Sequence, residues 1–211
     1  PVLIPFAIVT LIWGSTWIVI RDQISTVPTS WSVTYRFAIA GVAMLGWAAI
    51  RREPLGLDAR GIRFALLLAL AQFVLNFNLV YRAEQHITSG VVAVVYALLL
   101  VPNALLARVF LGQKMGRPLL IGSVIAVAGV ALLFVHEVRL SVRGADEAML
   151  GIAIAFAGVL TASVANVMQA TETSKAYPLA TMLGWAMLIG AGVDAGYAWA
   201  MAGPPAFEPR L

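Results

Sequence analysis

The segment Pro118-Leu-Leu-Ile-Gly-Ser-Val-Ile-Ala-Val-Ala-Gly-Val-Ala-Leu-Leu-Phe-Val135 contains no charged residue and decides the class of fold. At a rise of about 1.5 Å per residue, a helix of this length nearly spans the hydrocarbon core of a bilayer, which is about 30 Å thick. A membrane β-barrel would show short segments of alternating polarity instead. The segment therefore predicts a transmembrane helix.

Six further stretches are of similar length and are free of charged residues, except for Arg36 in the second. With the first they are Val2–Ile20, Trp31–Ile50, Phe64–Tyr81, Ile87–Ala107, Pro118–Val135, Ala148–Thr171 and Ala176–Val193, the last continuing to about Ala202. Of the 211 residues, 61% are hydrophobic and 11% are charged, against about 45–50% and about 25% in soluble domains. A soluble domain of this size could not bury so much apolar surface. We expect an all-α polytopic membrane protein with seven transmembrane helices in a lipid bilayer.

The 14 lysines and arginines exceed the 10 acidic residues. In a membrane protein this excess is typical of cytoplasmic loops, and we expect no nucleic-acid partner. If the helices cross alternately, the side with more basic residues carries Arg51, Arg52, Arg60, Arg63, Arg108, Lys114, Arg117 and Lys175, and the other carries Arg21, Arg82, Arg139, Arg143 and Arg210. The positive-inside rule then predicts a cytoplasmic N-terminus.

The longest polar connection, His136–Glu147, divides the chain. A helix, a short polar turn, a proline and another helix occur on both sides of it, with Pro28 in the first half and Pro178 in the second. A repeat with an odd number of helices inverts the orientation of its second copy. We expect a first unit over residues 1–135, a linker over 136–148 and an inverted second unit over 149–211.

The sequence resembles the EamA family of the drug/metabolite transporter (DMT) superfamily at four places. They are Leu11-Ile-Trp-Gly-Ser-Thr-Trp17, Pro28 followed by Tyr35-Arg-Phe37, the tract from Asn78 to Pro102, and the small-residue helix Ile121–Ala131. The resemblance is strong over residues 1–135 and weaker from 149 onward. It implies a ten-helix secondary transporter of bacterial inner membranes, built from two five-helix repeats, that exports amino acids or other metabolites. The chain then holds one complete repeat and two helices of the second, and we expect a fragment of a longer protein.

Polar side chains within the spans indicate a substrate cavity, because each is costly in lipid and tends to face a bundle interior or water. The alternative is that they only hydrogen-bond the helices to one another. Pro102 should bend its helix and free a backbone carbonyl. Three helices carry polar residues at helical spacing: Ser89, Tyr96 and Asn103; Gln72 and Asn76; and Ser163, Asn166 and Gln169.

Arg36 is the one charge well inside the second stretch. Its guanidinium suits a carboxylate, which arginine binds bidentately. The alternative is an arginine that extends to the membrane surface. The resemblance favours the carboxylate-binding role, because an arginine is common at this place in the family. With an aromatic cluster in the first helix, the expected cavity residues are Trp13, Thr16, Trp17, Arg36, Gln72, Asn76, Tyr96, Asn103 and Asn166.

Asp194 is a second charge within a span. In transporters an intramembrane carboxylate can carry the coupling proton. The alternative is a partly hydrated aspartate, or one paired with an arginine, near the outer end of its helix.

Other intramembrane residues are expected to pack rather than to bind substrate. Gly122, Ala126 and Gly129 form a small-residue stripe, which suits a neighbouring helix or a second copy of the chain in a homo-oligomer. Trp31 is expected in the aromatic belt at the membrane surface.

The sequence gives no basis for catalytic residues, a metal site or a cofactor. It contains no Walker A motif and no cysteine, and His86 and His136 lie in predicted loops without metal-ligand spacing. We expect no enzyme but a secondary transporter that exports small polar metabolites, such as amino acids, by alternating access. A membrane assembly or scaffold protein without transport activity is the alternative.

Overall fold

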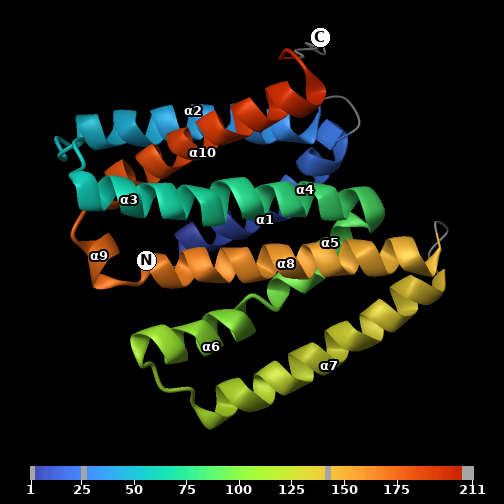
Figure 1. The fold of residues 1–211 in the computed structure, drawn as a ribbon. Helices are drawn as coiled ribbons and strands as arrows, with labels where there is room; N and C mark the ends of the chain where they lie inside the picture. The colour runs from blue at the N-terminus through green and yellow to red at the C-terminus, as the bar shows by residue number, and fades with distance from the viewer. Residues whose placement is uncertain (1–2, 25–27, 141–143, 206–211) are drawn as a thin grey trace.

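The computed structural model describes residues 3–24, 28–140 and 144–205, and every regular element in these ranges is helical. They contain seven helical spans that are long and apolar enough to cross a membrane, which confirms the predicted polytopic helical class (Figure 1). The elements are α1 (Leu3–Ile24), α2 (Thr29–Ile50), α3 (Ala59–Leu68), the π-helical segment η1 (Ala69–Asn76), α4 (Phe77–His86), α5 (Ser89–Ala97), α6 (Leu100–Leu111), α7 (Arg117–Leu140), α8 (Ala145–Gln169), α9 (Glu172–Lys175) and α10 (Leu179–Ala202).

The connection expected over residues 136–148 is shorter than the sequence predicts. Helix α7 continues to Leu140 and α8 begins at Ala145, while residues 141–143 lie outside the described residues. Gly144 has a φ of 98°, which only glycine adopts readily, and Asp146 and Glu147 follow in the first turn of α8. Acidic residues stabilise a helix N-terminus through the helix dipole, so the polar composition of this segment favours helix.

The third and fourth spans are both interrupted. In the third, the chain passes from α3 through η1 into α4 as one helix of changing pitch. In the fourth, Leu98 and Leu99 separate α5 from α6. Pro102 lacks the N–H that would bond the carbonyl of Leu98, and that carbonyl accepts instead from the N–H of Val101 at 2.9 Å.

Helices α2 and α10 form an antiparallel pair. At one end the indole N–H of Trp31 donates to the carbonyl of Gly203 at 3.2 Å, and at the other the hydroxyl of Thr181 donates to the carbonyl of Pro54 at 2.8 Å. Trp31 is therefore buried and stacked on Tyr35, so its ring packs inside the bundle, while its depth in the membrane stays a prediction. The hydrogen bond to α10 and the stacked ring supply the contacts that the membrane surface would otherwise give.

Glycines let α2 and α10 approach closely. A Cβ on Gly41 would lie 2.8 Å from Leu188 Cγ, and a Cβ on Gly184 would lie 2.7 Å from Leu45 Cγ. Each helix thus receives a leucine of the other where it has no side chain, which is how membrane helices gain packing energy.

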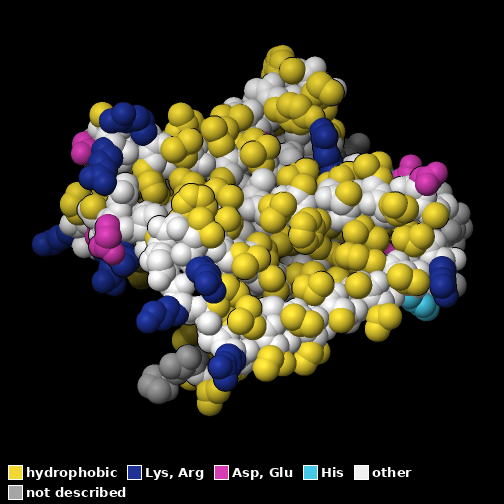
Figure 2. All heavy atoms as spheres, turned by 60° about the horizontal axis from the view of Figure 1, so that its bottom comes forward, with side chains coloured by type: hydrophobic (Ala, Val, Ile, Leu, Met, Phe, Trp, Pro, Cys, Tyr) yellow, Lys and Arg dark blue, Asp and Glu magenta, His cyan; other side chains and the backbone are white. Residues whose placement is uncertain are grey.

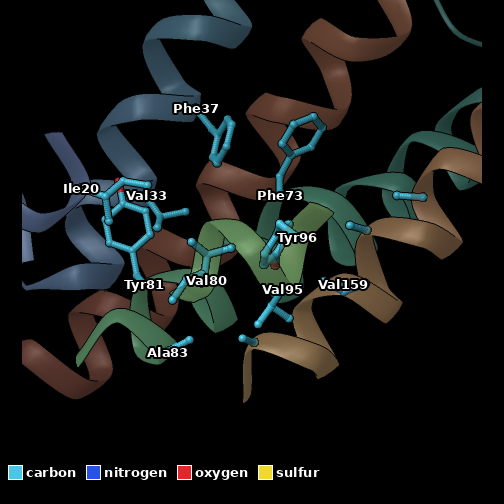
Figure 3. Packing of buried hydrophobic residues seen from close by; sticks show 14 of the residues in the cluster. Ile20, Val33, Phe37, Phe73, Val80, Tyr81, Ala83, Val95, Tyr96 and Val159 are labelled. Carbon is cyan, nitrogen blue, oxygen red and sulfur yellow. The ribbon is translucent and has the colours of Figure 1, made fainter. Parts of the chain in front are cut away.

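Helix α8 lies against η1, α4, α5 and α6 and closes the centre of the bundle. Its buried residues include small ones at spacings of three and four, namely Gly151, Ala155, Gly158, Ala162 and Ala165. Opposite these residues lies a cluster of large side chains, and Figure 3 shows Tyr96 and Val95 near Val159 of α8 and Phe37 beside Phe73. Small residues on one side and large ones on the other fill the interior.

Helices α1 and α7 lie at the periphery and expose most of their apolar side chains. Figure 2 shows hydrophobic side chains spread over the outside of the bundle, as expected for a surface that meets lipid. The small-residue stripe of α7 faces outward, because a Cβ on Gly122 or on Gly129 would meet no atom within 4 Å. Among the described residues, no neighbouring helix packs against it.

Candidate functional site

A cavity of about 230 Å³ lies between α1, α2, η1, α4, α5 and α8. All the cavity residues expected from the sequence line it, apart from Asn103. Six apolar residues of the walls were not predicted from the sequence, namely Ile12, Ile20, Phe77, Val80, Leu99 and Ala162. The walls are formed by Ile12, Trp13, Thr16, Trp17, Ile20, Arg36, Gln72, Asn76, Phe77, Val80, Tyr96, Leu99, Ala162 and Asn166.

Arg36 projects from α2 among aromatic side chains. Its Cζ lies 5.1 Å from the ring centroid of Phe77 and 5.8 Å from that of Phe37, and the guanidinium donates a hydrogen bond to the hydroxyl of Tyr81. Among the described residues Arg36 forms no ion pair with a carboxylate. The cavity wall therefore holds a half-buried positive charge supported by ring faces and one phenol.

Amide side chains from η1 and α8 supply the other polar groups of the wall. The Tyr96 hydroxyl donates to Asn76 Oδ1 at 2.6 Å, which fixes both side chains. Gln72 Oε1 is buried and has no hydrogen-bond partner among the described residues. Because a buried oxygen without a donor is costly, a ligand that donated a hydrogen bond to it would remove that cost.

Asn103 does not line the cavity, and its Oδ1 is 3.5 Å from Nδ2 of Asn166. The seven-residue spacing from Tyr96 predicts one helix face, but α5 ends at Ala97 and α6 begins at Leu100, so Tyr96 and Asn103 lie on different helices. The first residue of that predicted stripe, Ser89, donates to Glu84 Oε2 at 2.7 Å. Of the three, only Tyr96 lines the cavity.

The aromatic residues of α1 form the open edge of the cavity. Trp13 is 58% exposed, while the Trp17 ring is half-buried and lies 5.9 Å from that of Tyr96. The Thr16 hydroxyl donates to the carbonyl of Ile12 at 2.8 Å, and its oxygen can still accept a hydrogen bond.

Asp194 does not line the cavity. It is fully buried on α10, and its Oδ1 accepts from Asn78 Nδ2 at 2.7 Å. The sequence-based expectation missed Asn78 as a partner, although an amide within a span, off the face shared by Gln72 and Asn76, is itself a signal of a second polar contact.

Gly158 makes the bond between Tyr96 and Asn76 geometrically feasible, because a Cβ there would collide with the Tyr96 hydroxyl. We expect Gly158→Ala to lower the free energy of unfolding by about 1–3 kcal/mol, the usual cost of overpacking. Tyr96→Phe removes the colliding oxygen, so Gly158→Ala should cost less in that background. Thermal unfolding of the four proteins of this double-mutant cycle measures the difference, with Gly90→Ala, an open site, as the control. Equal costs of Gly158→Ala in both backgrounds would contradict the contact.

One end of the bundle is closed by contacts between the α2–α3 connection and the start of α10. Asp58 caps α3 by accepting from the N–H of Gly61 at 2.7 Å, and the Tyr177 hydroxyl donates to the same oxygen at 2.5 Å. The hydrogen bond from Tyr177, and after it the one from Gly61, hold the pKa of Asp58 below its usual range. The Trp185 indole donates to the carbonyl of Leu55 at 2.8 Å at the same end.

The pKa of Asp58 should respond to Tyr177. Because the folded pKa is lowered, this contact stabilises the fold above the ordinary carboxyl pKa and is lost as the pH falls through the lowered value. Tyr177→Phe should raise the pKa of Asp58, so that the remaining cap, in which Asp58 accepts from the N–H of Gly61, is lost at higher pH. Carbon NMR of labelled aspartate follows the titration, with Tyr197→Phe at the opposite end as the control. An unchanged titration in Tyr177→Phe would contradict the assignment.

Comparisons with known proteins identify a family to which most of this sequence is similar. A model described as "EamA-like transporter family" matches residues 2–135. Protein PagO of Salmonella typhimurium is 25% identical over 136 residues, which are 64% of this chain and 45% of that protein. A protein of Escherichia coli K12 named "Uncharacterized inner membrane transporter YedA" is 32% identical over 124 residues, which are 58% of this chain and 40% of that protein. The chain thus spans less than half the length of these curated relatives. No solved structure matches it.

Proposed function

The chain belongs to the EamA-like transporter family, and from this premise we propose that the protein is a secondary transporter of the bacterial inner membrane. Its substrate is a small metabolite with a carboxylate, such as an amino acid, which it exports by alternating access. The name of the Escherichia coli relative supports the location.

The observation that carries the proposal is the guanidinium of Arg36 on the wall of an intramembrane cavity without an acidic partner among the described residues. Desolvating an unpaired charge is costly, whereas a bound carboxylate would pair with it through two parallel hydrogen bonds. The cavity volume of about 230 Å³ lies below the about 300–1,000 Å³ of pockets for drug-sized ligands, which favours a small metabolite.

The other polar wall groups suit the opposite end of an amino acid. Gln72 Oε1 has no donor in the part of the chain that the structure describes, and Thr16 lines the same cavity. The side-chain oxygens of both residues can accept from an ammonium group. The rings of Trp13 and Trp17 provide an apolar wall for a side chain. A zwitterion would therefore meet a donor and acceptors in the same cavity.

The proposed orientation of the protein in the membrane rests on the distribution of its basic residues between the two ends of the bundle. The described cations of the more basic side gather at the end with the α2–α3 and α6–α7 connections, and Figure 2 shows several of them toward the left. Of the opposite group, Arg143 and Arg210 lie outside the described residues, as does the side chain of Arg21. The positive-inside rule then favours a cytoplasmic N-terminus.

The inverted repeat has geometric support in the way α2 and α10 begin. Pro28 precedes α2 with φ −50° and ψ 132°, and Pro178 precedes α10 with φ −58° and ψ 133°. The two helices start in the same way and run in opposite directions, as the second helices of two inverted repeats would.

Counterflow tests the proposal against the scaffold alternative, which requires no cavity at all. The intact natural protein is reconstituted into liposomes loaded with unlabelled L-amino acids, and entry of each tritiated amino acid is followed. We expect transient accumulation of at least one of them. A folded protein that shows no counterflow with any amino acid or small carboxylic acid would exclude this function.

A further inference from the structure

A second polar pocket lies on the other side of η1 from the cavity. It has a volume of about 290 Å³ and is formed by η1, α4 and α10. The lining residues are Val74, Leu75, Asn78, Leu79, Arg82, Val193, Asp194 and Tyr197. We propose that Asp194, held by Asn78, is a proton-binding site in this pocket, and that its occupancy is transmitted through the Asn78 amide to the end of η1.

The carboxylate is only half satisfied. Oδ1 of Asp194 accepts from Asn78 Nδ2 at 2.7 Å, but Oδ2 is buried and has no hydrogen-bond partner among the described residues. A buried carboxylate without a cation is costly, and binding a proton on Oδ2 removes the charge. The proton comes from bulk water and returns to it, so no other reactant is needed.

The surroundings favour a proton over a metal ion. Hard cations need about six oxygen ligands, and no group of three His, Cys, Asp or Glu occurs among the described residues. The charged and titratable groups that line the pocket are Arg82, from α4, and Tyr197, from α10, hydrogen-bonded to each other one helical turn above Asn78 and Asp194. The residues that η1 contributes are apolar, and on α2 Tyr35 and Arg36 line a hollow beside α1.

Asn78 joins the site to η1. Its Nδ2 donates both to Asp194 and, at 2.8 Å, to the carbonyl of Val74, which also accepts the backbone N–H of Phe77 where η1 ends. An ionised Asp194 attracts the amide through a charge-assisted bond, and a neutral one releases it toward Val74. Proton binding thus changes the hydrogen bonding at the junction of η1 with α4.

The segment η1 touches both sites. Gln72 and Asn76 line the substrate cavity, while Val74 and Leu75 line the pocket of Asp194. A π-helical stretch within an α-helix has a discrete alternative, the α-helical register, and such stretches are frequent at functional sites. An element with two arrangements that contacts two sites is what energetic coupling requires.

This inference rests on the proposed transport, and two measurements separate their failures. The first follows counterflow and pH-driven accumulation in liposomes of the intact natural protein, using the amino acid with the strongest counterflow. For one proton per cycle, a gradient of one pH unit supports up to about tenfold accumulation. Asp194→Asn should keep counterflow but lose the accumulation, whereas Asp146→Asn, at an exposed carboxylate, should keep both. If Asp194→Asn showed the same pH-driven accumulation as the wild-type protein, the assignment of Asp194 as the proton-binding site would be overturned.

The second measurement does not need transport. Infrared spectroscopy of the purified protein should show a protonated buried carboxyl that titrates, is present in Asp146→Asn and is missing in Asp194→Asn. Asn78→Leu should retain this band. The protection factors of the η1 amides, corrected for the intrinsic pH dependence of exchange, should change with pH in the wild-type protein and not in Asn78→Leu. A wild-type protein without the band at mildly acidic pH would overturn the proposal even if counterflow is normal. The band in a protein without counterflow would support the proton site while the transport proposal fails.

Discussion

Arg36→Ala is expected to lower substrate affinity by about thirtyfold, which corresponds to about 2 kcal/mol. Removing one partner of a desolvated charge pair costs about 2–5 kcal/mol, and the lower end applies because Arg36 is only half-buried. Arg36→Lys keeps the charge but loses the planar fork, so its affinity should lie between those of wild type and Arg36→Ala. The concentration dependence of counterflow in liposomes measures all three.

The control for Arg36 is Arg63→Ala. Arg63 is exposed at the end of the bundle with the α2–α3 connection, and its Nε donates to the carbonyl of its own helix at Ala59, 3.2 Å away. Its loss should leave affinity unchanged. Arg36→Ala also removes a hydrogen bond to Tyr81, so thermal unfolding is measured in parallel. A folded Arg36→Ala protein with wild-type affinity would rule out a carboxylate site at this residue.

The second large effect is expected at the contact of α2 with α10. Gly184→Ala places a Cβ 2.7 Å from Leu45 Cγ and 3.2 Å from the backbone nitrogen of Leu45, so the helices must separate. We expect a loss of about 1–3 kcal/mol in the free energy of unfolding. Gly192→Ala on the same helix meets nothing within 4 Å and should stabilise by up to about 1 kcal/mol through helix propensity.

Thermal melting of the two purified variants compares these effects directly. The account predicts shifts of opposite sign from the same substitution on one helix. A lower melting temperature in both, or an unchanged one in Gly184→Ala, would contradict the close packing of α2 against α10.

The spans and most of the cavity wall could be predicted from the sequence, because length, apolarity and helical spacing are local properties. Gln72 and Asn76 are four residues apart on one continuous helix, and they line the cavity as that spacing implies. Asn103 was misplaced because the spacing argument assumes an unbroken helix, and Pro102 interrupts the hydrogen-bond ladder between Tyr96 and Asn103.

The remaining features depend on contacts between distant segments. Nothing in the composition of Ala69–Asn76 marks a π-helical stretch, since it contains neither proline nor glycine. The pairing of Asn78 with Asp194 joins residues 116 positions apart, and the burial of Trp31 depends on Gly203. Such partners follow from the packing of η1 and α2 against α10, which local periodicity does not encode.

The most direct test of the central assignment is a binding comparison between an amino acid and its amide. The two ligands are nearly identical in shape and differ in the carboxylate that Arg36 would hold. In the intact purified protein, titration calorimetry should show the amino acid binding about thirtyfold more tightly than its amide. In Arg36→Gln the affinity for the amino acid should fall to that for the amide, while the affinity for the amide should stay unchanged. Equal affinities in the wild-type protein, or the same preference in Arg36→Gln, would contradict the account.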